Sequence, residues 1–321
     1  MPRLAIVIVT WNVQEHLRRC LTSIQQAPTR DFTVETWVVD NASTDGTSDM
    51  VRDTFPWVHL IASTENLGFA AGNNLALRHM GFPLNGGRAA TTDLPDAIFF
   101  LNPDTEVVGD AIPRLWDTLF ANPRTGMVGP RLVYGNGRHQ HSGFFFPNLW
   151  QVFLDFFPLH GRLLESRLNG RYARSLYMGN APFPVDFILG AAMMVRREVI
   201  LQVGAFDEGY WLYCEEMDWA RRIRAAGWEI RVEPRATVVH YEGQSSRQFR
   251  AQAFVALWRS RLRYFRKYHG PGFNLAMRGI VWLGLKYLEH RARHLPPRER
   301  EAHLRAYAQV RAMLWRGGEH L

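Results

Sequence analysis

The segment from Ala97 to Asp104 reads AIFFLNPD, five apolar residues followed directly by Asn-Pro-Asp. A continuous apolar run of this length is typical of a strand buried on both faces of a parallel sheet. Proline fixes its own φ and pushes the preceding residue toward an extended conformation, so the polar end of the segment is stiff. The segment predicts a buried strand that holds Asn102 and Asp104 at its carboxyl end.

Apolar runs of the same kind recur through the first 132 residues and alternate with amphipathic stretches of helical periodicity. The predicted strands are 4–9, 33–39, 58–61, 97–101 and 127–132. Further along, the pattern predicts a helix over 215–226, strands near 229–232 and 237–239, and a basic amphipathic helix over 250–269. The fold class is therefore α/β, with a mostly parallel sheet flanked by helices. Ligands of such sheets bind beyond the carboxyl ends of the strands.

Charge divides the chain at about residue 240. Residues 241–321 carry 16 Lys and Arg against 5 Asp and Glu, whereas the preceding residues carry 22 against 25. A nucleic-acid-binding protein would carry basic residues along a recognition element, so we expect no nucleic acid partner. We predict a catalytic domain over 1–245 and a basic helical extension over 246–321. The extension is either a helical cover or a peripheral contact with an anionic membrane.

The compartment is predicted from the cysteines and from the first residues. Cys20 and Cys214 are far apart and show no metal-binding spacing, which is typical of core residues in a reducing environment. Met1 to Arg3 lead directly into a strand, without the apolar stretch of a signal peptide. We therefore expect a cytoplasmic protein, with any membrane contact on the inner face of the plasma membrane.

Polar residues follow three of the predicted strands, and their chemistry suggests a nucleotide and a metal. Asp40 at a strand end suits a ribose or a base imino group, although the turn from 41 to 46 could equally serve only as a helix cap. Neither a GxGxxG nor a GxxxxGK motif is present, and Lys267 and Lys286 are the only lysines. A divalent cation, Mg²⁺ or Mn²⁺, is the remaining means of offsetting a diphosphate. Asp104 and Glu106 offer the oxygen ligands that such cations prefer.

Two later features add candidate catalytic and metal-binding groups. Three carboxylates, Glu215, Glu216 and Asp218, lie at the start of the helix over 215–226, where the helix dipole also favours them. The preceding aromatic stretch is the kind of surrounding that raises a carboxylate pKa and makes it a usable general base. His240 follows a strand and is a candidate further metal ligand.

Together these segments resemble the family 2 glycosyltransferases with the GT-A fold, a Rossmann-like fold, and especially the rhamnosyltransferase-like members that build bacterial cell-surface polysaccharides. The resemblance covers roughly residues 4–245. It rests on the motifs at 8–12, 38–46, 66–74, 101–104, 206–208 and 215–219 and on His240.

The resemblance implies a metal-dependent, inverting transfer of a sugar, with rhamnose the sugar it suggests, from a dTDP-linked or UDP-linked donor. The acceptor would be a hydroxyl of a glycan or of a polyprenyl-linked sugar. The implied donor-binding residues are Thr10, Asn12, Asp40, Asn41, Asp45, Asn66, Gly68, Asn73 and Asn102.

The implied metal ligands are Asp104 and His240. Asn102-Pro103-Asp104 corresponds to the family's DxD motif with Asn in the first position, so Asn102 is better regarded as a positioning residue than as a ligand. The pair Glu215-Glu216 corresponds to the family's acidic base motif, usually Glu-Asp. The base therefore stays open among Glu215, Glu216 and Asp218.

Two other function classes compete with this interpretation. A non-catalytic nucleotide-sugar-binding subunit of a polysaccharide assembly complex would keep the Asp40 pocket and lose the metal or base residues, which are all present here. A nucleotidyltransferase would open with a glycine-rich basic loop after its first strand, whereas residues 10–14 read TWNVQ.

Overall fold

The computed structural model describes residues 1–89, 91, 93–241 and 250–315. These residues form two compact units. The first unit contains Met1–Phe144, Arg174–Trp211 and the described residues from 215 to 241, and the second contains Phe145–Ala173, Leu212–Cys214 and the described residues from 250 to 315. The predicted domain boundary at 245/246 lies outside the described residues and stays a prediction.

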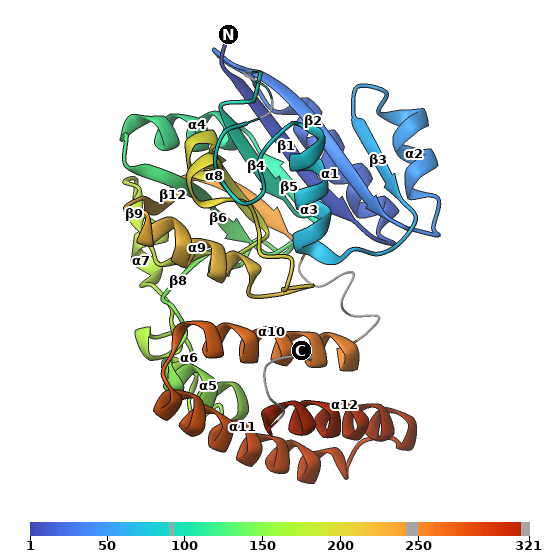
Figure 1. Cartoon of the computed structure of the whole chain (residues 1–321), viewed down its shortest axis with the longest axis vertical. Coiled ribbons are helices and arrows are strands. Elements are labelled where there is room, and N and C mark those ends of the chain that lie inside the picture. Colours follow the sequence, from blue (N-terminus) through green and yellow to red (C-terminus); the bar gives the residue numbers. More distant parts are fainter. Residues whose placement is uncertain (90, 92, 242–249, 316–321) are drawn as a thin grey trace. The chain divides into compact units, whose positions relative to one another are not determined.

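The first unit is built on one large, mixed sheet (Figure 1). Its strand order is β3-β2-β1-β4-β11-β6-β12-β5, with β7 paired to β6 and β9 paired to β12, while β8 and β10 form a separate ribbon. The elements are β1 (Arg3–Thr10), α1 (Gln14–Gln26), β2 (Thr33–Asn41), α2 (Thr47–Thr54), β3 (His59–Ser63), α3 (Gly68–His79), β4 (Ala97–Leu101), β5 (Thr105–Val108), α4 (Ala111–Ala121), β6 (Thr125–Val133), β7 (His139–Gln140), β8 (Gly143–Phe144), α7 (Arg174–Tyr177), β9 (Phe183–Pro184), β10 (Phe187–Ile188), β11 (Ala192–Arg196), α8 (Arg197–Val203), α9 (Glu215–Ala225) and β12 (Glu229–His240).

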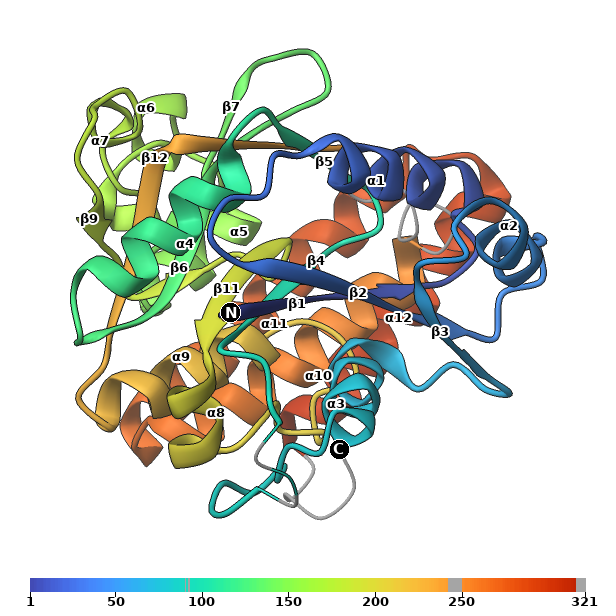
Figure 2. The same cartoon turned by 90° about the horizontal axis from the view of Figure 1, so that it is seen from above.

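The predicted mostly parallel sheet is confirmed. β1 pairs in parallel with β2 and β4, β2 with β3, and β6 with β12, whereas β11 and β5 run antiparallel to their neighbours. Strands β1 and β4 are buried almost throughout because helices cover both sheet faces. Figure 2 shows α1 and α2 on one face and α3, α8 and α9 on the other. Parallel strands place their carboxyl ends at one sheet edge, which gathers the polar segments there.

The end of the sheet that carries β5 and β12 differs from the sequence prediction in two respects. Residues 105–108, for which the sequence predicted no strand, turn back as strand β5, which runs antiparallel to β12 and pairs Thr105 with His240. The strands predicted near 229–232 and 237–239 are one strand, β12, with an irregularity between Glu233 and Thr237. The intervening residues look like a loop in sequence, but a bulge keeps the strand continuous and bends it.

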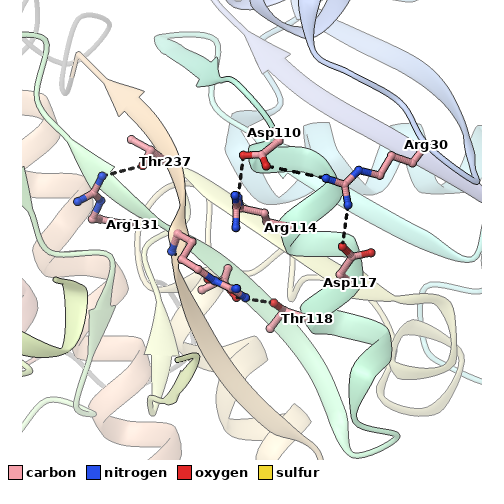
Figure 3. Close-up of polar contacts among 9 residues, drawn as sticks. Arg30, Asp110, Arg114, Asp117, Thr118, Arg131 and Thr237 are labelled. Atoms are coloured by element: carbon pink, nitrogen blue, oxygen red, sulfur yellow. Dashed lines mark hydrogen bonds and ion pairs between the residues drawn. The ribbon is translucent and has the colours of Figure 1, made fainter. Parts of the chain in front are cut away.

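Polar contacts hold this irregular part of β12 against α4 and β6. Glu233 is fully buried, and its carboxylate accepts hydrogen bonds from the Thr118 hydroxyl (2.7 Å) and the Arg235 guanidinium (2.9 Å). Arg131 of β6 donates to the hydroxyl of Thr237 (2.9 Å). Figure 3 shows this contact beside Thr118 of α4. It also shows the ion pair of Asp110 with Arg114 and those of Asp110 and Asp117 with Arg30, which lies between α1 and β2. These contacts fix the strand that ends at His240.

The second unit is helical. Its elements are α5 (Leu149–Phe156), α6 (Gly161–Leu164), the 3-10 helix η1 (Arg167–Asn169), α10 (Arg250–Tyr268), α11 (Pro271–Ala292) and α12 (Pro297–Trp315). A methyl group at Gly284 of α11 would lie 2.1 Å from the Phe156 ring, so α5 and α11 pack in direct contact. Among the described residues, none of these helices combines the length and apolar character needed to cross a bilayer.

Candidate active site

The loops that follow β1 and β2 are joined by reciprocal hydrogen bonds. Asn12, in a left-handed conformation (φ 52°), donates its backbone N–H to the Ser43 hydroxyl (2.9 Å), and its Oδ1 accepts from the Thr44 N–H (2.7 Å). An asparagine tolerates positive φ better than most residues. Thr10 is buried at the end of β1, and its Oγ1 has no hydrogen-bond partner among the described residues. The two loops therefore form one polar ledge at the carboxyl edge of the sheet.

The two aspartates of this ledge differ in exposure. Asp40 is buried, and its carboxylate accepts from the Ser43 N–H (3.0 Å) and from the Ser48 hydroxyl. Asp45 is exposed, and its two oxygens accept from the N–H groups of Gln14 (2.9 Å) and Thr47 (3.2 Å). The Asp40 carboxylate accepts a hydrogen bond from the backbone of the turn, and Asp45 binds the first N–H of α2. The two aspartates therefore have the structural role that the alternative interpretation predicted. Nucleoside binding by these residues stays a prediction.

The start of α3 is held close to the ledge by polar side chains. Asn41 donates to the Gly68 carbonyl (3.0 Å), and the Asn66 carbonyl oxygen Oδ1 accepts from the Gly68 N–H (3.0 Å). Gly68 has φ +80°, and a Cβ there would lie 2.3 Å from the Trp211 carbonyl oxygen. Only glycine fits this conformation and this close approach. The predicted residues Asn41, Asn66 and Gly68 thus come together at one turn.

Two asparagine side chains of α3 form hydrogen bonds with backbone groups. Asn73, a predicted donor-binding residue, is buried and donates to the Phe69 carbonyl (2.9 Å) of its own helix. Asn74 was not among the predicted site residues. Its side chain accepts from the Phe206 N–H (3.1 Å) and donates to the Phe206 carbonyl (2.9 Å). Asn74 therefore holds the loop before α9 against α3, a role no local pattern indicates because its partner is distant in sequence.

Asp104 and His240 meet beyond the ends of β4 and β12. Asp104 Oδ1 lies 3.4 Å from His240 Nε2, and both side chains are buried. The pairing of β5 with β12, and the hydrogen bond from the Tyr241 N–H to the Asp104 carbonyl (2.9 Å), bring the two residues together. Asn102 contributes through its backbone, donating its N–H to the Ala191 carbonyl (2.9 Å) and accepting the Thr105 hydroxyl (2.7 Å).

Gln140 of β7 contacts the other side of the histidine. Its Oε1 lies 3.2 Å from His240 Nδ1, and the side chain is buried. With its proton on Nδ1, the ring donates to Gln140 Oε1 and turns Nε2 toward Asp104. Metal-binding histidines are typically oriented by a hydrogen bond of this kind. No local pattern indicates Gln140, because its partner His240 is distant in sequence.

The pair of Asp104 and His240 fits a divalent cation that is also bound by a substrate. The two atoms are close enough to contact one ion, and an oxygen and an imidazole nitrogen suit Mn²⁺ and Mg²⁺. Glu106 is drawn away by its ion pair with Arg19 (2.5 Å). In the described part of the chain, no group of three or more His, Cys, Asp or Glu side chains could hold a metal. Phosphate oxygens and water would have to complete the coordination, as is usual for Mg²⁺.

The three carboxylates at the start of α9 have different surroundings. Asp218 is fully buried and is bound by the Arg222 guanidinium (2.9 Å) and the Tyr210 hydroxyl (3.3 Å). Glu215 is also buried, and burial, with a contribution from the charge of Glu216, raises its pKa well above its ordinary value. Asp218 is therefore a partner of Arg222, and Glu215 holds its proton to a higher pH than an exposed glutamate does.

Glu216 is half-buried and lies beside the loop between β10 and β11. A methyl group at Gly190 would lie 3.8 Å from Glu216 Cβ, and the next residue, Ala191, accepts the hydrogen bond from Asn102. The same loop therefore contacts the Asn-Pro-Asp segment and passes beside the aliphatic part of the Glu216 side chain. Among the three candidates, Glu216 has the surroundings that best suit a general base.

The thiol nearest the Asn-Pro-Asp segment offers no competing nucleophile. Cys20 Sγ lies 3.7 Å from the Asn102 carbonyl oxygen, and burial raises the pKa of the thiol to about 12. A thiol with that pKa stays protonated at neutral pH. Cys20 is a core residue, as its sequence context predicted.

The fold is the GT-A fold of glycosyltransferases. Residues 5–204 match the family described as Glycosyl transferase family 2, and the chain belongs to that family. Its relatives include an N-acetylglucosaminyl-diphospho-decaprenol L-rhamnosyltransferase of Mycobacterium tuberculosis, 30% identical over 76% of this chain and 77% of the relative. A dTDP-rhamnosyl transferase of Shigella flexneri is 24% identical over 75% and 69%, respectively.

Solved structures show the same fold at lower sequence identity. A mannosyltransferase from Pyrobaculum calidifontis in complex with GDP-Man and Mn²⁺ has a TM-score of 0.56 and 20% identity, covering 98% of this chain and 84% of that one. The enzyme GalNAc-T7 with UDP, GalNAc and Mn²⁺ has a TM-score of 0.53 and 15% identity, covering 75% and 44%. The predicted resemblance and the predicted fold are both confirmed.

Proposed function

We propose that this glycosyltransferase moves a sugar from a nucleotide-diphosphate donor to a hydroxyl group of a lipid-linked acceptor, in one inverting displacement. The observation that carries the proposal is the 3.4 Å approach of Asp104 and His240, with Gln140 behind the histidine. The names of the mycobacterial and Shigella relatives support L-rhamnose as the first sugar to test, a dTDP-linked donor, and a polyprenyl-diphosphate sugar as the acceptor.

The donor would lie along the carboxyl edge of the sheet. The ledge of Thr10, Asn12 and Asp40 would hold the nucleoside, next to the turn at Gly68. Asp104 and His240 would hold a divalent cation against the diphosphate. Such a cation supplies positive charge that stabilises the departing nucleoside diphosphate.

Glu216 would act as the general base in the transfer. Its carboxylate takes the proton from the acceptor hydroxyl, and the acceptor oxygen forms a bond to the anomeric carbon from the side opposite the diphosphate. The bond between that carbon and the diphosphate oxygen breaks, and the nucleoside diphosphate leaves with the electron pair. Base catalysis of this kind contributes roughly 10²- to 10⁴-fold to a rate.

The metal assignment is tested with Asp104→Ala. The variant is expected to stay folded, lose Mn²⁺ affinity measured by calorimetry with nucleoside diphosphate present, and lose sugar transfer. Asp49→Ala, at an exposed carboxylate of α2, is the matched control. A folded Asp104→Ala variant with normal transfer would exclude the assignment.

The base assignment is tested with Glu216→Gln. The rate of transfer should fall by roughly 10²-fold or more while the dissociation constant of the donor changes little. Normal turnover by this variant, or an equal loss of donor binding, would contradict it. A wild-type chain that binds donor but turns over none of several lipid-linked acceptors would favour the non-catalytic alternative.

A further inference from the structure

Helix α11 of the second unit exposes large apolar side chains along one side. Leu275 is 63% exposed, Leu283 55%, Trp282 40% and Tyr287 38%. At 100° per residue, these positions and Lys286 lie within about 140° of one another around the helix axis. A surface of this kind on a folded domain marks an interaction site more often than a scatter of single residues does.

The opposite side of α11 belongs to the core. Met277, Val281 and Leu285 are fully buried, and Gly284 lets the helix contact the Phe156 ring. The helix is therefore held firmly by one side while its other apolar side stays in solvent. Loose packing does not account for the exposure.

Basic residues accompany the exposed apolar side. The Lys286 ammonium lies 6.0 Å from the Trp282 ring centre, and the Arg291 guanidinium lies 5.9 Å from that of Tyr287. The one acidic residue of α11, Glu289, forms ion pairs with Lys286 (3.3 Å) and Arg311. The face made of Leu275, Trp282, Leu283, Lys286, Tyr287 and Arg291, termed the α11 face, thus combines four large apolar side chains with two basic ones. Lys286 lies among the apolar side chains, and Arg291 lies at one margin.

The basic amphipathic helix predicted over 250–269, α10, does not offer an exposed apolar side of this kind. Its Trp258, Leu262 and Phe265 are at most 1% exposed. The apolar side of α10 is therefore used in packing and is not available to another surface. An amphipathic pattern in the sequence does not distinguish an apolar side that packs in the core from one that is exposed to solvent.

We propose that the α11 face binds the surface of an anionic lipid bilayer. Trp282, Leu283 and Tyr287 would enter the boundary between headgroups and acyl chains, and Lys286 and Arg291 would contact anionic headgroups. The net positive charge of residues 241–321 is complementary to such a surface. The inference deepens the proposed function, on which it rests for a lipid-linked acceptor that lies in a membrane.

Sedimentation of the full chain with vesicles tests the proposal. Wild type should bind vesicles of phosphatidylglycerol and phosphatidylcholine and bind phosphatidylcholine alone weakly. Trp282→Ser with Leu283→Ser should lower the partition coefficient by about tenfold or more, because the variant lacks two apolar side chains that would enter the bilayer. Lys286→Gln with Arg291→Gln should lower it by about fivefold per charge on anionic vesicles only, corresponding to about 1 kcal/mol per basic residue. Trp57→Ser, at an exposed tryptophan of the first unit, is the control that should bind as wild type does.

A site-specific label separates this face from a general attraction. Cys20 and Cys214 are both buried, so an environment-sensitive dye can be placed on Leu283→Cys. Its fluorescence should rise with anionic vesicles, whereas dye on Leu304→Cys of α12 should respond less. Three outcomes would each overturn the proposal. The dye could respond equally at the two positions, or the variant Trp282→Ser with Leu283→Ser could bind vesicles as the wild type does. The third is a dimer in solution that this double variant abolishes. Vesicle binding is measured without donor, so absence of sugar transfer would sink the proposed function and leave this result intact.

Discussion

Gln140 is expected to set the metal affinity of the site without contacting the metal. In Gln140→Met the side chain keeps its length but loses the oxygen that lies 3.2 Å from His240 Nδ1. Gln140 and His240 are both about 5% exposed, so water cannot readily replace the lost acceptor. The imidazole then loses the hydrogen bond that selects its tautomer and ring orientation, and Nε2 no longer points reliably toward Asp104.

The size of the effect follows from the contact that is removed. Loss of a hydrogen-bond partner behind a metal-binding histidine typically weakens metal binding by about 10- to 100-fold. That range corresponds to about 1.4–2.7 kcal/mol, similar to the cost of leaving one buried donor unsatisfied. We expect the same loss for Mn²⁺ here, together with a decrease of about 1 kcal/mol in the free energy of unfolding.

The assay is a Mn²⁺ titration of the full chain with saturating nucleoside diphosphate, followed by electron paramagnetic resonance of the free ion. Gln140→Glu is the matched control, because it keeps an acceptor at the same position and should retain most of the affinity. Unchanged Mn²⁺ affinity in a folded Gln140→Met variant would refute the positioning role. So would an equal loss in Gln140→Glu, since the acceptor would then not be what matters.

Three further predictions concern stability. Asp218→Asn should lower the free energy of unfolding by about 3 kcal/mol, because it breaks a buried pair with Arg222. Glu216→Gln should change the free energy of unfolding little. Equal effects of the two substitutions in urea denaturation would contradict the division of roles. Burial raises the pKa of Glu233, but its hydrogen bonds outweigh burial and leave the folded pKa below the ordinary 4.5. The free energy of unfolding of the wild type should therefore decrease as pH falls through the folded pKa of Glu233. That of Glu233→Gln should decrease less over the same pH range. Gly68→Ala, at φ +80° and 2.3 Å from the Trp211 carbonyl oxygen, should cost about 2–4 kcal/mol and weaken nucleotide binding, as thermal melts and donor titration would show.

Much of the sheet was predictable because its strands are buried on both faces. Runs such as 4–9 and 97–101 are typical of strands buried on both faces, and the polar residues after them mark the strand ends. Strand β5 was missed because Thr105–Val108 is short and alternates in burial beside charged residues. Strand β12 was divided in two because the polar residues at its bulge look like a loop, although Glu233 is buried there.

The candidate site was predictable in its residue types and less so in their roles. The three carboxylates of α9 are equivalent in sequence, and a helix N-terminus favours all of them. Their separation into an ion-paired Asp218, a buried Glu215 and a half-buried Glu216 depends on neighbours from other elements, such as Gly190. The same applies to α10 and α11, whose apolar sides differ only in whether another helix covers them.

The sequence by itself determined the α/β class and, through its motifs, the family, and it singled out Asp104 as a candidate metal ligand. Strand burial and strand-end chemistry are local properties that can be followed along the chain. The tertiary structure decided that Asp104 meets His240 and that Gln140 orients the histidine, through the antiparallel return of β5 onto β12 and the pairing of β7 with β6. Those contacts join segments far apart in sequence, and their energies depend on distance, burial and direction, which no local pattern contains.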